Sequence, residues 1–308
     1  MIRHLFRRPL VPIALLAALL LMSLAAAAGS YPLTITDAAG HKITFDRAPQ
    51  RVASIFLGAD EMLLALLPPE RLVMISAFAT DPTQSFAVDA AQKIPNRLQK
   101  ADAEQILAVR PDVVFAAPFN DPNVLKQLSD LGVKVVQVQA TDSIAEIEAQ
   151  LLEIGRIVDA EPQSQALVAG MKTRLAALAD QTGAISHKWR VLDYSPWQFT
   201  AGAGTTVDQT ITAAGAINVA AEAKVSGWGK IGPEQIVAWN PDVIIYGDGS
   251  PGFGAQLAAD PALQSVAAVK NHRIYQVPAR DLGALSQHIV DAVYDLAQVL
   301  YPDVVGAK

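Results

Sequence analysis

The chain has 308 residues, of which 51% are hydrophobic and none is cysteine, and its formal net charge is −6 at pH 7. This length allows one large core or two ordinary ones, because single domains commonly contain about 100 to 200 residues. The acidic charge argues against nucleic-acid binding, which needs a basic face. Without cysteine we expect neither a disulfide nor a lipid anchored on a cysteine side chain.

Residues 1–28 have the pattern of a cleaved secretory signal peptide. A basic start is followed by an apolar run from Leu10 to Met22 and by a small-residue tail with an Ala-x-Ala site ending near Ala28. The alternative is an uncleaved membrane anchor, because this apolar stretch approaches the roughly 20 residues that span a bilayer. The alanine-rich tail and Pro12 favour cleavage, so we expect a periplasmic protein.

The first part of the mature chain, residues 29–142, reads as an α/β lobe. Alternating residues at 31–46 predict a hairpin. Valine-rich apolar runs then alternate with helical segments, as is typical of a parallel sheet covered on both faces. The predicted buried strands are residues 51–58, 71–76, 112–117 and 133–138.

A helical segment, residues 143–186, comes next. Its second predicted helix begins with Pro162, which suits a first helical turn, and runs for at least 20 residues, or about 30 Å. That length is enough to bridge two lobes. Strand and helix patterns resume in residues 187–308, with strands at 189–195, 242–247 and 269–278 and helices at 206–217, 233–240, 255–266 and 288–300.

One sequence element occurs twice, and its two copies begin 130 residues apart. Residues 104–116 read EQILAVRPDVVFA and residues 234–246 read EQIVAWNPDVIIY. This spacing is too wide for a solenoid, whose units contain roughly 20 to 50 residues, and it indicates two similar lobes. We interpret the repeated Pro-Asp as structural, because proline ends the helix and aspartate caps the turn into the strand.

Four segments together resemble the periplasmic substrate-binding proteins of ABC importers for iron chelates, haem and vitamin B12. The resemblance covers about residues 31–300 and implies two Rossmann-like lobes with parallel sheets, one long helix joining them and a ligand cleft between them. It also implies a monomer that docks one lobe on each subunit of a membrane permease, which works with an ATPase. The segments are LTITDAAGHKITFDRAPQRVASI, EQILAVRPDVVFA, AGAGTTVDQTITAAGAINVAAE and EQIVAWNPDVIIY.

The first residue of each repeat is a candidate for that docking. In the family a surface glutamate on each lobe engages arginines of the permease, and by motif these glutamates correspond to Glu104 and Glu234. Each could instead be a first-turn acid that complements the helix dipole. Because both occur in one repeat, we favour docking, in which charge pairs set orientation and encounter rate.

Candidate ligand contacts lie at the carboxyl ends of the predicted strands, where open α/β sheets bind ligands. Large rings there suit a flat chelate, although lobe packing accounts equally well for each phenylalanine. Arg280 could meet a carboxylate or phosphate of the ligand, or form a salt bridge with Asp281; Lys230 and Arg97 are weaker candidates. The aromatic candidates are Phe56, Phe78, Phe119, Tyr194, Trp197 and Trp228.

The residue types also bear on metals and catalysis. Among five histidines only His288 is predicted near the cleft loops, so we expect no free metal-ion site. Haem ligation by Tyr194 or His288 stays open. Without Cys, Gly-x-Ser-x-Gly or a paired His–acid motif, we expect no enzyme and no cofactor. The expected cargo is a ferric siderophore, haem or cobalamin; the alternatives are a sensor or scavenger without a transporter and a bare metal-ion receptor.

Overall fold

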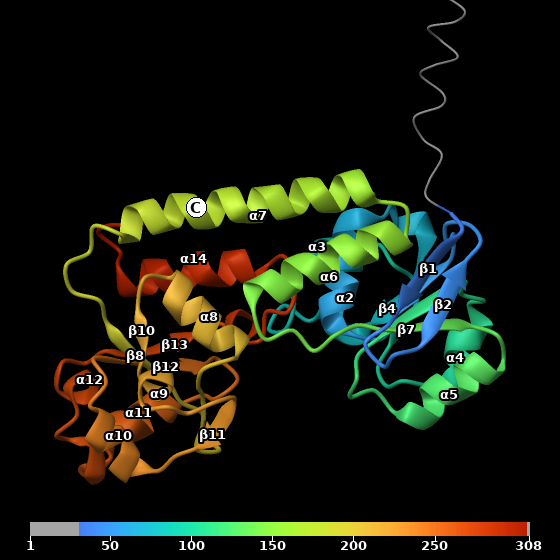
Figure 1. Ribbon diagram of the computed structural model, residues 1–308. Helices are drawn as coiled ribbons and strands as arrows, with labels where there is room; N and C mark the ends of the chain where they lie inside the picture. Colours follow the sequence, from blue (N-terminus) through green and yellow to red (C-terminus); the bar gives the residue numbers. More distant parts are fainter. Residues whose placement is uncertain (1–30, 307–308) are drawn as a thin grey trace, which may run out of the picture.

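The computed structural model describes residues 31–306, which form two α/β lobes side by side, bridged along one side by a long helix (Figure 1). The N-terminal lobe, residues 31–142, contains a five-stranded parallel sheet and a separate antiparallel hairpin, as the sequence predicts. The strands are β1 (Leu33–Thr36), β2 (Lys42–Phe45), β3 (Val52–Ser54), β4 (Leu72–Ser76), β5 (Arg97–Leu98), β6 (Val113–Ala116) and β7 (Lys134–Gln137). The sheet order is β5-β4-β3-β6-β7.

The C-terminal lobe, residues 187–306, has a four-stranded parallel sheet of order β10-β8-β12-β13. In both lobes the strand order reverses beside the first strand, between β3 and β6 and between β8 and β12, and such reversals open a crevice at the carboxyl ends. A short antiparallel pair, β9 with β11, stands apart from this sheet. The strands are β8 (Arg190–Asp193), β9 (Phe199–Ala201), β10 (Ile217–Asn218), β11 (Trp228–Lys230), β12 (Val243–Gly247) and β13 (Ile274–Val277).

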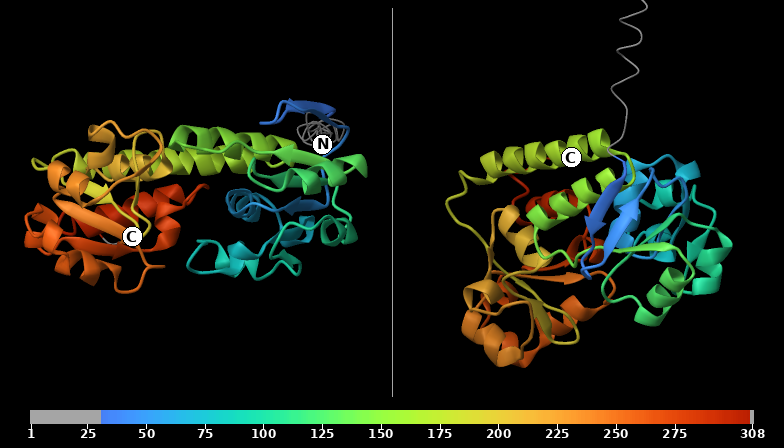
Figure 2. Two further views of the ribbon diagram at one scale, coloured as in Figure 1. Left: turned by 90° about the horizontal axis from the view of Figure 1, so that it is seen from below. Right: turned by 45° about the vertical axis from the view of Figure 1, so that its right-hand side comes forward.

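Helices cover the sheets, and Figure 2 shows the two lobes from two further sides. Those of the N-terminal lobe are α2 (Leu57–Leu66), α3 (Val88–Ala91), α4 (Ala103–Ala108) and α5 (Pro122–Asp130), with 3₁₀ turns η2 (Pro69–Arg71) and η3 (Ala77–Thr80). Those of the C-terminal lobe are α8 (Thr206–Ala213), α9 (Val219–Glu222), α10 (Pro233–Trp239), α11 (Phe253–Ala259), η4 (Pro261–Leu263), α12 (Ala267–Lys270), α13 (Ala279–Leu282) and α14 (Ile289–Leu300).

Several local predictions differ from the structure. The helix predicted over residues 255–266 is divided at Asp260 into α11 and the 3₁₀ turn η4, and the strand predicted over residues 269–278 is shortened to Ile274–Val277. The helix predicted over residues 206–217 ends at Ala213, because Gly215 turns the chain with a φ of +87° and residues 217–218 enter the sheet. Trp228, predicted in a loop, begins strand β11, which pairs with β9.

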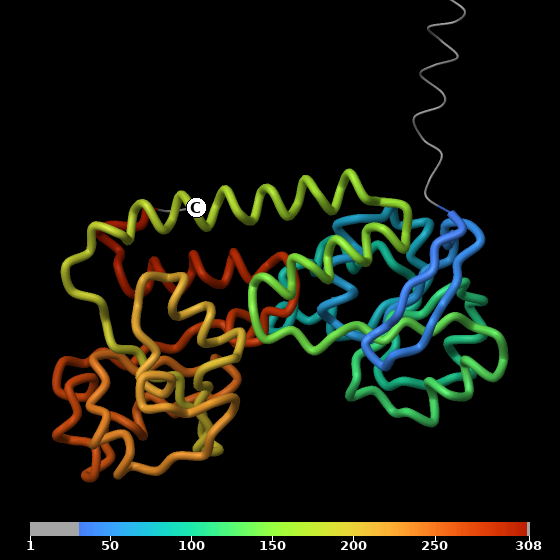
Figure 3. The backbone as a smooth tube through the Cα atoms, in the orientation of Figure 1, coloured from blue at the N-terminus to red at the C-terminus, as the bar shows by residue number. Residues whose placement is uncertain are grey.

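The helical segment consists of α6 (Ile144–Ile157) and the 22-residue α7 (Glu161–Thr182), and α7 joins the lobes as predicted. Met171 of α7 lies in a core cluster of the N-terminal lobe, and Leu178 lies in one of the C-terminal lobe. Helix α14 crosses the boundary in the same way, since Val290 belongs to the first cluster and Val293 to the second. The Tyr294 hydroxyl donates to the Arg174 carbonyl at 2.8 Å and fixes α14 against α7. Two helices, not one, therefore brace the lobes (Figure 3).

The first copy of the repeated Pro-Asp lies at the amino end of the N-terminal sheet and holds the start of strand β3 there. The Asp112 carboxylate accepts the backbone N–H groups of Gln50 and Arg51 at 2.7 and 2.9 Å. The Arg51 guanidinium donates to the carbonyls of Val109 and Arg110, which end helix α4. Arg110 itself is left-handed, with a φ of +46°.

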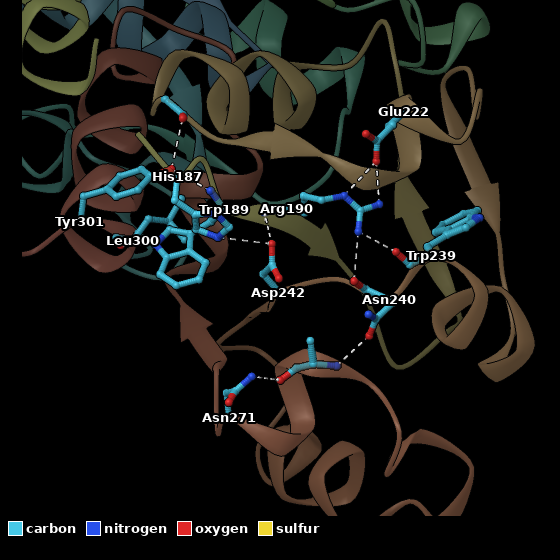
Figure 4. Close-up of polar contacts among 12 residues, drawn as sticks. His187, Trp189, Arg190, Glu222, Trp239, Asn240, Asp242, Asn271, Leu300 and Tyr301 are labelled. Carbon is cyan, nitrogen blue, oxygen red and sulfur yellow. Dashed lines mark hydrogen bonds and ion pairs between the residues drawn. The ribbon is translucent and has the colours of Figure 1, made fainter. Parts of the chain in front are cut away.

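The second copy repeats this arrangement in the C-terminal lobe (Figure 4). Asp242 accepts the backbone N–H of Arg190 at 3.1 Å, and the Arg190 guanidinium donates to the carbonyls of Trp239 and Asn240. The same guanidinium binds Glu222 through two nitrogens, at 2.6 and 3.0 Å. Asn240 is left-handed, with a φ of +45°. Pro-Asp is structural in both lobes, but each aspartate holds the start of the neighbouring strand instead of capping its own turn.

None of the helices within residues 31–306 is long and apolar enough to cross a membrane. The predicted signal peptide, residues 1–28, lies outside the described residues.

Candidate functional site

A hollow between the lobes lies where the carboxyl ends of the N-terminal strands face the C-terminal lobe, and we call it the interlobe hollow. Segments that follow β3, β6 and β7 form one wall. The opposite wall comes from the start of α8, from β11 and from the loop after α13. Its lining residues are Phe56, Ala117, Pro118, Phe119, Gln139, Ala140, Thr141, Asp142, Thr205, Thr206, Trp228, Leu282, Gly283 and Leu285.

The N-terminal wall is a pair of phenylalanines at the sheet's crevice. Phe56 is only 7% exposed and meets the ring of Phe119 edge-on, with ring centroids 5.6 Å apart. Phe119 is 71% exposed, and the Asn120 side chain, which accepts the Ala117 N–H at 2.7 Å, fixes its turn. A side chain at Gly58 would lie 2.8 Å from the Phe56 ring, so glycine is needed for this packing. Phe56 is thus the buried support of this wall, and the exposed ring of Phe119 forms its surface.

The C-terminal wall presents Trp228, which is 60% exposed. Strand β11 carries it opposite Ala201 of β9. At the start of α8 the Thr205 hydroxyl donates to the Gly202 carbonyl at 2.9 Å and accepts the Asp208 N–H. An aromatic ring from each lobe therefore borders the hollow, an arrangement suited to a ligand with large apolar faces.

Among the described residues that line this hollow, Asp142 is the only charged one. Its backbone N–H donates to Glu146 Oε2 at 2.7 Å, and the Ser143 hydroxyl caps the following helix, so the residue sits on a fixed turn. Sequence reasoning did not single out Asp142, Thr205 or Thr206. A Thr-x-x-Asp start before α8 was a usable signal for the threonines, whereas nothing in the sequence marked the loop after α13.

Arg280 lies in a second interlobe hollow, which it shares with Glu61, Phe86, His288 and others. Its guanidinium lies 4.8 Å from the Phe86 ring centroid, and Nη1 donates to the Pro82 carbonyl of the other lobe. This cation therefore ties the lobes together instead of lining the first hollow.

His288 also stacks on Phe86, with centroids 5.2 Å apart and planes 8° from parallel. Its Nδ1 lies 2.7 Å from Asp291, which also binds Arg174 at 2.9 Å. Burial raises the pKa of Asp291, but the hydrogen bonds and charges of His288 and Arg174 outweigh burial and hold that pKa at about 2. The imidazole is thus engaged in an ion-pair network.

Tyr194 belongs to the core of the C-terminal lobe. It is 5% exposed and packs against Phe253, with ring centroids 5.9 Å apart. Burial raises the pKa of its phenol, and the charge of Asp260 adds to this. Neither Tyr194 nor His288 is among the residues that line the interlobe hollow.

The remaining predicted contacts also lie off this hollow. Phe78 and Trp197 are exposed, but neither lines it. Lys230 is exposed further along β11, and Arg97 donates to the Gln92 carbonyl at the edge of the N-terminal sheet. The structure thus brings together three of the predicted aromatics: Phe56, Phe119 and Trp228.

Buried acids lie behind the walls. Burial raises the pKa of Asp60 and that of Asp193 to about 7 each. Glu61 accepts hydrogen bonds from Ser85 Oγ at 2.8 Å and from Ser286 Oγ at 2.5 Å, so this carboxylate joins segments of both lobes. Within residues 31–306 no group of three or more His, Cys, Asp or Glu residues could hold a metal ion.

The two candidate docking glutamates occupy matching positions. Glu104 and Glu234 are each the second residue of their helix, α4 and α10, and both are exposed. In Figure 1 both helices lie on the side of the molecule away from α7. Among the described residues neither glutamate has an ion-pair partner within 4.0 Å. Their caps differ, since Asp102 caps α4 and Gly232 precedes α10.

Comparisons with known proteins agree with this architecture. A model of the periplasmic binding protein family matches residues 52–280. The chain is 27% identical over 281 residues to the uncharacterized ABC transporter substrate-binding lipoprotein YvrC of Bacillus subtilis, covering 89% of this chain and 87% of that protein. It is 30% identical over 249 residues to a cobalamin-binding protein of Halobacterium salinarum, covering 80% of this chain and 66% of that protein.

Among solved structures, the periplasmic haem-binding protein RhuT from Roseiflexus sp. RS-1 in apo form superposes with a TM-score of 0.71 at 25% identity, covering 82% of this chain and 98% of that chain. Two lobes around a cleft are thus shared as well as sequence. The chain belongs to the periplasmic binding protein family, as a substrate-binding protein of ABC transporters.

Proposed function

We propose that the protein captures a metal chelate in the interlobe hollow and delivers it to the permease of an ABC importer. The observation that carries the proposal is the pair of exposed rings, Phe119 and Trp228, which border one hollow from opposite lobes. Rigid aromatic surfaces gain most from a ligand that is large, rigid and partly apolar, as chelates and macrocycles are. The cobalamin-binding and haem-binding relatives support the same ligand class.

The lobes are braced in a way that suits capture with little motion. Helices α7 and α14 both cross the boundary, and Glu61 binds Ser286 from the opposite lobe. A wide opening would break these buried contacts, so we expect closure by a few degrees only. The ligand then meets walls that are already in place.

Delivery is assigned to Glu104 and Glu234. Each is exposed in the first turn of a short helix, one on each lobe, and two such carboxylates suit a permease surface with two-fold symmetry. Charge pairs of this kind align the partners and speed their encounter. The permease groups that fit are arginines.

The test is isothermal titration calorimetry of the mature protein with cyanocobalamin, haem, a ferric trihydroxamate, a ferric tricatecholate and molybdate. We expect one chelate to bind with 1:1 stoichiometry and to change the tryptophan fluorescence. Binding of molybdate alone, or of none of the five, would contradict chelate capture.

A further inference from the structure

The interlobe hollow carries little charge. Its described lining contains one carboxylate, Asp142, and neither lysine nor arginine. Arg280 is held by the Pro82 carbonyl and the Phe86 ring. Lys230 lies on the same face of β11 as Trp228, two residues further on, but it is not among the lining residues.

Helix starts do not compensate for the missing cations. Three helices begin at the hollow, because Phe56 precedes α2, Asp142 lies just before α6 and Thr205 precedes α8. Helix N-termini attract anions, yet each of these helices carries an acid in its own first turn. These acids are Asp60, Glu146 and Asp208.

Asp142 carries the only lining side chain of a type that commonly ligates metals, because the lining includes no histidine, tyrosine, cysteine or methionine. Tyr194 is buried against Phe253, and His288 is bound to Asp291 and stacked on Phe86. With at most one such side chain in the lining, a chelate held here brings nearly all of its metal ligands with it. Its contacts with the protein are to its organic shell.

On this basis, and resting on the proposed function, we infer that the cargo is a coordinatively complete chelate without net negative charge, and that Asp142 is the residue that discriminates against anionic chelates. Asp142 has no ion-pair partner within 4.0 Å among residues 31–306, and its backbone is held by Glu146, so its carboxylate is available at the rim of the hollow. Such an acceptor favours amide N–H or ammonium groups on the ligand shell and disfavours carboxylates and catecholate complexes.

The inference is tested with two pairs of chelates that differ in charge but not in the metal's coordination. One pair is cyanocobalamin and its monocarboxylic acid, in which one amide is hydrolysed. The other is ferrioxamine B, which carries an ammonium group, and its N-succinyl derivative. Calorimetry is run on the pair whose parent binds, in the wild type, in Asp142→Asn and in Asp89→Asn. The last is the matched control, because Asp89 is an exposed acid that lines the second hollow.

In the wild type we expect the carboxylate-bearing member to bind roughly three- to tenfold more weakly than its parent, the range for one charge contact near a surface. The ratio should approach one in Asp142→Asn, stay at the wild-type value in Asp89→Asn and shrink at high salt. Equal or tighter binding of the carboxylate member by the wild type would overturn the inference, as would an unchanged ratio in Asp142→Asn. Binding of haem alone would also overturn it while leaving chelate capture intact, whereas binding of no chelate would contradict the proposed function itself.

Discussion

The two lobes are alike at the amino ends of their sheets and different at the carboxyl ends. At the amino ends, Arg51 with Asp112 and Arg190 with Asp242 make the same backbone contacts. At the carboxyl ends, Phe119 of the N-terminal lobe lines the hollow directly after the sheet. In the C-terminal lobe the β9–β11 pair, which is separate from the sheet, supplies the lining residue Trp228. The repeated Pro-Asp contacts build the fold, whereas the parts that differ between the lobes line the interlobe hollow.

This difference explains why the aromatic of the C-terminal lobe that lines the hollow is Trp228 and not Tyr194. Tyr194 directly follows the first strand β8, just as Ile55 and Phe56 follow β3, but it packs into the lobe's core. The β9–β11 pair stands beyond it and carries Trp228 to the hollow. The two walls of the hollow are therefore unequal, although the lobes share a common arrangement of strands and helices.

The largest expected effect concerns a pair of exposed acids that occupy matching positions in the two lobes. Glu104→Ala combined with Glu234→Ala should reduce chelate uptake by the cognate permease by on the order of 100-fold, because both orienting charge pairs are lost. Ligand affinity measured by calorimetry should not change, since neither residue lines the hollow.

The matched control for this pair is Glu153→Ala combined with Asp180→Ala. These are exposed acids on α6 and α7, so the control removes the same charge from helices that do not belong to the repeat. Normal uptake by the Glu104/Glu234 variant, or an equal loss in the control, would show that the shared glutamates do not dock.

A second prediction uses a buried acid of the C-terminal lobe. The pKa of Asp193 is about 7 in the folded protein because of burial, and its ordinary value is 3.8. The folded state therefore binds the proton more tightly, and this residue makes stability fall as pH rises from about 4 to about 7. Asp193→Asn should match the wild type near pH 4 and exceed it at pH 8 by roughly 2 to 4 kcal/mol.

Urea unfolding at pH 4.5, 6 and 8 measures this difference, and a constant offset at all three values would count against the buried ionisation. Asp60→Asn is the comparison in the N-terminal lobe. Burial raises its pKa as well, but Ser76 donates to the Asp60 carboxylate through both its N–H and its hydroxyl. At pH 8 the gain in the free energy of unfolding should be smaller for Asp60→Asn than for Asp193→Asn, because the substitution weakens the hydrogen bonds from Ser76.

The third prediction tests how much the repeated aspartates at the amino ends of the two sheets stabilise the fold. Asp112→Ala and Asp242→Ala should each lower the free energy of unfolding by about 1 to 3 kcal/mol, because backbone N–H groups lose their acceptor. Asp112→Ala should cost more, since Asp112 accepts two backbone N–H groups, whereas Asp242 accepts one at a longer distance. Urea unfolding provides the measurement.

Asp130→Ala is the control for both, because Asp130 makes only an exposed ion pair with Lys126. It should change stability by less than about 1 kcal/mol. If all three variants lost the same amount, the repeated aspartates would have no structural role beyond that of an ordinary surface acid.

Much of the fold could be predicted because its signals are local. Apolar periodicity found the hairpin, α7 and the buried strands of both sheets, and the doubled Pro-Asp indicated two lobes. Short elements such as β9, β11 and α12 were missed, because two to four residues carry too little periodicity. The bracing by α14 was missed because its apolar face is continuous, and only tertiary packing divides it between two cores.

The site was predicted in part for a similar reason. The rule that ligands lie beyond the carboxyl ends of strands found Phe56 and Phe119 on the open N-terminal lobe. It could not tell that Tyr194 turns into the core, or that Arg280 and His288 hold Phe86 in a second hollow. Those outcomes depend on which neighbouring groups in the folded protein contact each side chain. The spacing of residues along the sequence does not carry that information.

The central claim is that one ligand contacts unequal walls from both lobes, and chelate affinity in four alanine variants tests it most directly. Phe119→Ala and Trp228→Ala remove the exposed ring of each wall. Phe78→Ala and Trp197→Ala remove exposed rings of the same kinds that do not line the hollow. By calorimetry we expect the first two each to weaken binding by roughly tenfold or more, and the two controls to stay within about threefold of the wild type. Losses confined to one lobe, or equal losses in the controls, would contradict the account.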